Sequence, residues 1–97
     1  HEYAVGKFRN NNWGKIKIRY NLMGKFIEKN IIDETLKNIP QDEYTSTFNK
    51  MANKEWMHKS KLDLTSRERR FFKTVQSRGW EFDLINKFLS EIKKNKP

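Results

Sequence analysis

Cysteine is absent from the 97-residue sequence. Its absence excludes disulfides, iron–sulfur clusters, cysteine-ligated zinc and thiol catalysis. Small secreted domains usually need disulfides, so we expect a cytoplasmic protein. No apolar run approaches the ~18 residues that suggest a membrane-spanning helix, and we expect neither a signal peptide nor a membrane association. The first residue is His1 and not methionine, which favours a fragment or a processed chain.

Glycine and proline are scarce, with four and two residues, and the glycines lie singly. No glycine-rich phosphate loop can therefore be present. Apolar residues recur at helical spacing, and no segment alternates apolar and polar residues over the length of a strand. The pattern predicts an all-α protein of six helices: a short one carrying Tyr3, Ala4 and Phe8, then helices over about 13–23, 28–38, 42–59, 65–79 and 81–94.

Capping signals suggest where some of these helices begin and end. Asn12 is a candidate N-cap for the second helix, and Gly24 is placed to end it. Thr65 and Glu68 have the spacing of a capping box at the start of the fifth helix, which Gly79 is placed to end.

The third and sixth predicted helices match each other at an offset of 53 residues. Apolar positions coincide, and upstream Lys25, Ile27 and Glu28 correspond to Arg78, Trp80 and Glu81. The match predicts tandem three-helix repeats, over 1–40 and 41–97, packed as an elongated helical array. Chance similarity between amphipathic helices is the alternative. The residues expected to face inward are Ile31, Ile32, Leu36, Ile39, Leu84, Ile85, Phe88, Leu89 and Ile92.

Acidic residues are missing from a long N-terminal stretch. Lysine and arginine total 21 against 12 acidic residues, a net charge of +9, and six basic residues lie between Glu2 and Glu28 without an acid. A second basic cluster spans 67–78. Such clusters favour a polyanionic or acidic partner, although solvated helix faces are the alternative. The predicted partner-binding residues are Lys15, Lys17, Arg19, Arg69, Arg70, Lys73 and Arg78.

Histidine is too rare to build a catalytic or metal site. His58, the one histidine away from the terminus, lies among lysines, and a surface or capping role is the simpler interpretation. Trp56 and Trp80 fit core positions, whereas Trp13 could pack on the first helix or lie partly open. Stacking of nucleic-acid bases on Tyr3 or another aromatic of the basic stretch is an alternative. We predict no enzyme, no cofactor and no metal.

Three motifs are similar to those of the RecX family. Residues 13–19 (Trp-Gly-Lys-Ile-Lys-Ile-Arg) resemble its middle repeat, and the Arg-Arg pair at 69–70 and residues 78–85 (Arg-Gly-Trp-Glu-Phe-Asp-Leu-Ile) resemble its last repeat. RecX proteins usually carry three repeats, so the chain resembles the second and third. One departure is Phe26, which stands where the family usually has glycine.

The resemblance implies a regulatory protein that binds the RecA recombinase or its filament on DNA. It implies inhibition of strand exchange and ATP hydrolysis, within recombination, DNA repair and the SOS response, by a monomer with weak DNA binding of its own. The residues alone favour a second function equally, that of a direct nucleic-acid-binding helical module. Only the resemblance ranks the regulator first.

Overall fold

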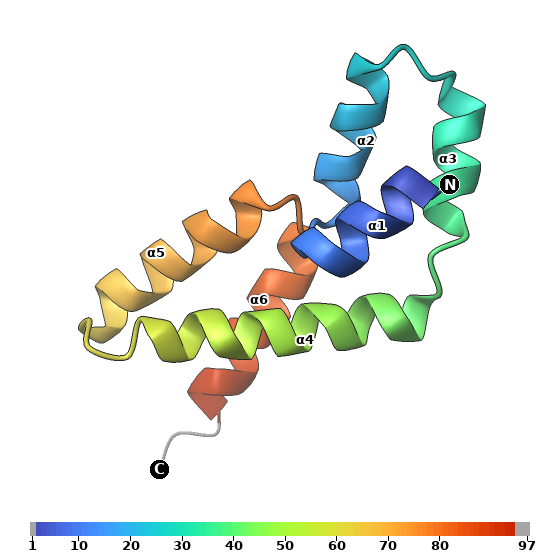
Figure 1. Ribbon diagram of the computed structural model, residues 1–97. Coiled ribbons are helices and arrows are strands. Elements are labelled where there is room, and N and C mark those ends of the chain that lie inside the picture. The colour runs from blue at the N-terminus through green and yellow to red at the C-terminus, as the bar shows by residue number, and fades with distance from the viewer. Residues whose placement is uncertain (1, 95–97) are drawn as a thin grey trace.

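The computed structural model describes residues 2–94 and confirms the all-α class (Figure 1). No strand occurs among these residues. The molecule measures 47 × 24 × 21 Å, which confirms an elongated helical array. Its six helices are α1 (Glu2–Asn11), α2 (Lys15–Gly24), α3 (Lys29–Lys37), α4 (Gln41–His58), α5 (Leu64–Ser77) and α6 (Phe82–Lys94).

Helices that follow one another in the chain pack in pairs. The closest pairs are α1 with α2, α2 with α3, α4 with α5, and α5 with α6. In Figure 1, α4 runs along the lower side of the molecule, with α1–α3 above one of its ends and α5 above the other. One continuous apolar core joins all six helices, and the division into units 1–40 and 41–97 stays a prediction.

Four aromatic rings form the centre of the core. Trp80, which is 1% exposed, lies between α1 and α4 with its ring centroid 4.7 Å from that of Tyr44 and 5.4 Å from that of Phe48. Phe8 of α1 packs on the rings of Tyr44 and Trp80. The indole Nε1 of Trp80 donates to the carbonyl of Asn12 over 2.9 Å, so its polar group is satisfied. The predicted core role of Trp80 is confirmed.

Most of the predicted inward-facing residues lie in the core. Ile32, Leu36, Ile39, Ile85 and Phe88 are buried, and Leu84, Leu89 and Ile92 are partly buried against them. The prediction is wrong for Ile31, which is 48% exposed. Its helix α3 packs mainly on α2, and a single neighbour covers only a narrow stripe of a helix.

Two of the predicted N-terminal capping signals are wrong. Asn12 lies before α2 in a left-handed conformation (φ 57°), and the N-cap is Gly14. Helix α5 begins at Leu64 with Asp63 as its N-cap, so no capping box forms. Glu68 instead pairs with Lys93 of α6 over 3.2 Å. The capping residues expected from the local sequence are therefore not the ones that the folded chain uses.

Two glycines were expected to end helices, and both predictions hold. Helix α5 ends just before Gly79, whose φ of 88° is the left-handed conformation that glycine adopts without strain. Helix α2 ends at Gly24, but the left-handed residue that follows it is Phe26, with φ 63°.

Candidate functional site

Three cations of α5 form the most exposed basic surface among the predicted site residues. Arg69, Arg70 and Lys73 are all exposed, and in residues 2–94 none of them takes part in an ion pair. Phe71 and Val75, on the opposite face of the helix, are fully buried. We call Arg69, Arg70 and Lys73 the α5 basic cluster. Its charges are held out to solvent because the apolar face fixes the rotation of the helix.

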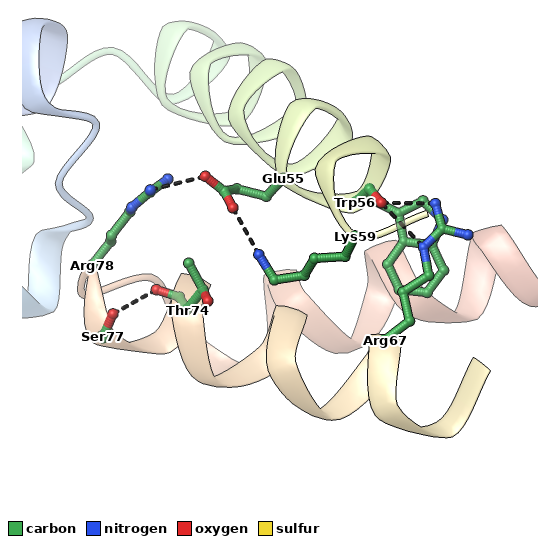
Figure 2. A network of polar contacts seen from close by, with 7 residues as sticks. All are labelled: Glu55, Trp56, Lys59, Arg67, Thr74, Ser77 and Arg78. Atoms are coloured by element: carbon green, nitrogen blue, oxygen red, sulfur yellow. Dashed lines mark hydrogen bonds and ion pairs between the residues drawn. The ribbon is translucent and has the colours of Figure 1, made fainter. Parts of the chain in front are cut away.

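The start of α5 is anchored to the end of α4 by Arg67. Its Nε and Nη2 atoms donate to the carbonyl of Trp56 over 3.1 and 2.7 Å (Figure 2). The guanidinium also lies 4.0 Å from the centroid of the Trp56 ring, a cation–π contact. Arg67 therefore positions the helix, whereas the α5 basic cluster is left free for a partner.

The end of α5 is anchored through Glu55 of α4. One carboxylate oxygen accepts from Arg78 over 2.8 Å and the other from Lys59 over 3.0 Å (Figure 2). Partial burial works to raise the pKa of Glu55, but the hydrogen bonds and charges of Lys59 and Arg78 outweigh it and lower the pKa. Arg78 thus has a structural contact, and its predicted role in partner binding stays a prediction.

The predicted cations of α2 all have intramolecular contacts. The ammonium of Lys15 lies 4.6 Å from the ring centroid of Tyr44, and that of Lys17 lies 4.7 Å from that of Trp13. Arg19 pairs with Asp33 of α3 over 2.8 Å. A partner would have to compete with these contacts, which makes α2 the weaker candidate surface.

A backbone contact between Gly14 and Gly79 brings the two charged regions together. The amide of Gly14 donates to the carbonyl of Arg78 over 2.8 Å, and that of Ile16 to the carbonyl of Gly79 over 3.0 Å. A Cβ on Gly14 would lie 2.3 Å from the Gly79 oxygen, and one on Gly79 would lie 2.4 Å from the Lys17 nitrogen. Only glycine at both positions allows this approach, which places the start of α2 beside the end of α5.

A row of cations and rings along α1, α2 and the segments that follow them was not predicted from the sequence. Lys25 lies over the ring of Tyr3, and Lys7 lies between Tyr3 and Trp13, with ammonium-to-centroid distances of 4.8, 5.6 and 5.1 Å. The ammonium of Lys17 also lies near the ring of Trp13, 4.7 Å from its centroid. The interleaving of basic and aromatic residues in the acid-free stretch was the signal for it.

The remaining polar groups hold the fold together. Tyr44 accepts a hydrogen bond from the amide of Lys15 over 2.8 Å and donates one to Glu81, which ties α2 and α6 to α4. Burial, and then the hydrogen bond to Glu81, raise the pKa of Tyr44 far above its ordinary value, so this phenol stays protonated.

Neither a candidate metal site nor a candidate membrane-spanning helix occurs among residues 2–94. They contain no group of three His, Cys, Asp or Glu residues that could hold a metal ion. No helix within that range combines the length and the apolar character that crossing a bilayer requires. His58 is exposed at the end of α4. That the protein is no enzyme stays a prediction.

The described residues define a small helical-repeat protein with an exposed basic surface. Over 91 residues the chain is 26% identical to the regulatory protein RecX of Clostridium perfringens, a match that covers 92% of the chain and 43% of the relative. Over 81 residues it is 30% identical to the regulatory protein RecX of Clostridium tetani, with 81% and 38% covered.

The similarity to RecX proteins predicted from the motifs is therefore confirmed. The chain spans about two fifths of the length of these curated relatives. No family model and no solved structure matches the chain.

Proposed function

We propose that the chain is a regulator that binds the RecA recombinase filament on DNA and inhibits strand exchange and ATP hydrolysis. Its similarity to two proteins named as the regulatory protein RecX supports the class of function. The observation that carries the proposal is the α5 basic cluster, whose three cations are exposed and have no acidic partner within residues 2–94.

A nucleoprotein filament presents the charges that such a cluster binds. It exposes phosphates and acidic side chains together, and arginine can bind either group through two parallel hydrogen bonds. The predicted α2 residues Lys15, Lys17 and Arg19 and the turn residue Arg78 are the second part of the proposed contact. The Gly14–Gly79 contact keeps this second part beside the end of α5. An elongated molecule with this surface suits a groove better than a single binding pocket.

Direct binding to single-stranded nucleic acid is the second candidate, and the row of cations and rings on α1 and α2 favours it. Lysines along such a row would contact phosphates, and the rings of Tyr3 and Trp13 would stack on bases. A protein of net charge +9 binds bare DNA in any case, with an affinity that falls steeply as salt is added.

The two functions are distinguished by comparing RecA-coated with bare single-stranded DNA in the same buffer. The regulator binds the coated DNA more tightly, and it suppresses ATP hydrolysis by RecA at concentrations where it barely binds bare DNA. Equal affinity for the two would contradict the regulator and leave the nucleic-acid binder.

A pair of charge reversals tests the α5 basic cluster. Arg69→Glu combined with Lys73→Glu should weaken binding to the filament by about tenfold or more. Lys50→Glu combined with Lys54→Glu is the matched control, because these lysines are also exposed and one helical turn apart on α4. Equal losses in the two double variants would show that only net charge matters and would exclude a site on α5.

A further inference from the structure

Phe26 is in a conformation and an environment that do not suit a phenylalanine. Its side chain is 94% exposed, and its φ of 63° lies in the left-handed region. It follows α2 at the position of a Schellman motif that usually carries glycine. The amide of Phe26 donates to the carbonyl of Met23 over 3.0 Å, and that of Ile27 to Leu22 over 3.2 Å. The folded chain gains nothing from this ring.

Phe26 has other exposed apolar residues close to it in the chain. Met23, Ile27 and Ile31 are 54%, 38% and 48% exposed, and with Phe26 they form what we call the Phe26 edge, at the end of the α2–α3 hairpin. In Figure 1 this end of the hairpin is the part of α2 and α3 farthest from α4. Large apolar side chains grouped at an exposed position mark an interaction surface.

Two grooves flank Ile27, and both have basic and apolar walls. One, of about 320 Å³, is lined by apolar side chains together with Lys29 and with Arg19, whose charge is already paired with Asp33 of α3. The other, of about 290 Å³, is lined by Lys25. Neither groove has an acidic lining residue, and Glu28 is the only acid in the turn itself. The edge therefore complements a surface that is apolar at its centre and acidic around it.

We infer that the Phe26 edge is the apolar anchor by which the chain binds the protein component of the filament. The inference rests on the proposed function and divides the contact into two parts. The α5 basic cluster supplies a salt-sensitive contact, and the ring of Phe26 enters an apolar pocket of the partner whose rim is acidic. Buried aromatic anchors of this kind carry much of the affinity of protein–protein interfaces.

Other occupants of the edge fit the structure less well. Two copies of the edge facing each other would bring Lys25 and Lys29 of both copies together. A further helical unit could not pack on the turn at Phe26 in the way that α2 packs on the turn at Gly79. At Gly79, even a Cβ would lie 2.3 Å from the Cβ of Lys17, and Phe26 carries a whole side chain at the equivalent position. Bare nucleic acid would not bury the apolar side chains of Met23 and Ile31, because bases stack on aromatic rings.

The experiment compares Phe26→Ala and Phe26→Gly with Met57→Ala, a control in which another exposed apolar residue, on α4, is truncated (68% exposed). Dissociation constants are measured for RecA assembled on poly(dT) and for bare poly(dT), at several salt concentrations. Both Phe26 variants should bind the filament at least about tenfold more weakly. The loss should be the same at every salt concentration, because the lost contact is apolar. Met57→Ala should bind as the unmodified chain does.

Reversing the charges of Arg69 and Lys73 should instead make binding less dependent on salt. Circular dichroism confirms that each variant is folded. If the unmodified chain prefers the filament but Phe26→Ala keeps its affinity, the anchor is overturned and the proposed function stands.

Three other results would overturn the anchor. An equal loss of affinity for bare poly(dT) would identify base stacking. Self-association that disappears in Phe26→Ala would identify a second copy. A chain that shows no preference for the filament would overturn the proposed function, and the anchor with it.

Discussion

The turns at 25–28 and 78–81 correspond at the 53-residue offset of the sequence match and have similar backbone conformations. Phe26 and Gly79 are both left-handed, with φ of 63° and 88°. Their surroundings are opposite. The second turn is enclosed, with Gly79 against the backbone of α2 and Trp80 1% exposed, while in the first Phe26 is 94% exposed. The same local conformation thus holds the array together at one place and leaves an apolar side chain exposed to solvent at the other.

Truncating the apolar residue after each left-handed position should give the largest difference between the turns. Trp80→Ala should lower the free energy of unfolding by about 3–5 kcal/mol, because the central ring of the core is lost. Ile27→Ala, at the equivalent and partly exposed position, should lower it by about 1 kcal/mol or less. Urea unfolding followed by circular dichroism measures both. If Trp80→Ala prevents folding, the smaller loss of stability in Trp80→Phe can be compared with that of Ile27→Ala instead. Equal losses would mean that the turns are equally buried.

A methyl group on Gly79 should be the next most damaging change. Gly79→Ala should destabilise the chain by about 2–4 kcal/mol, since alanine is strained at this φ and its Cβ would collide with the backbone of Lys17. Gly24→Ala is the matched control: nothing lies within 4 Å of the added Cβ, and alanine favours a helix. This control should be neutral or slightly stabilising. Were Gly79→Ala equally neutral, the close approach of α2 to this turn would be wrong.

Removing the side chain of Phe26 should raise the free energy of unfolding rather than lower it. Phe26→Gly should stabilise the isolated chain by about 1 kcal/mol, because glycine has no strain in the left-handed region and little buried contact is lost. Thermal unfolding at fixed protein concentration checks this. A loss of stability would show that the ring packs against the chain in solution.

Acid should affect the second turn more than the first. The pKa of Glu55 is lowered by Lys59 and Arg78 against the effect of burial, so these ion pairs stabilise the chain above its ordinary pKa of 4.5. That stabilisation is lost as pH falls through the lower pKa of the folded state. Glu55→Gln should therefore cost about 0.5–1 kcal/mol at pH 7 and nothing at low pH.

Glu43→Gln is the control for this pH dependence, because the Glu43–Arg9 pair is more exposed. Its effect should be smaller at every pH. Urea titrations between about pH 3 and pH 7 compare the two variants. A pH-independent loss in Glu55→Gln would mean that packing and not charge is responsible.

The helices and the central rings could be predicted from the sequence because their signals are local. Tyr44, Phe48 and Trp56 recur at helical spacing along α4, and all three are buried. Helix starts were less predictable. The segment before α2 takes its path from the Gly14–Gly79 contact, which joins residues far apart in the chain, so Asn12 could not act as a cap.

The candidate site was predictable in its composition but not in its geometry. A run of charges shows that α5 is basic, yet only the structure separates Arg67 and Arg78, which hold α5 to α4, from the free Arg69 and Lys73. The left-handed conformation of Phe26 was not predicted, because Gly24, two positions earlier, was expected to end the helix.

The contact between Gly14 and Gly79 makes the main chain a fixed spacer between the two charged regions. Its hydrogen bonds join backbone atoms, which do not change when a surface lysine or arginine is replaced. The charge pattern along α2 and α5 can therefore be altered residue by residue while the two helices keep their distance and angle. Affinity for a partner can be tuned on this molecule without rebuilding its shape.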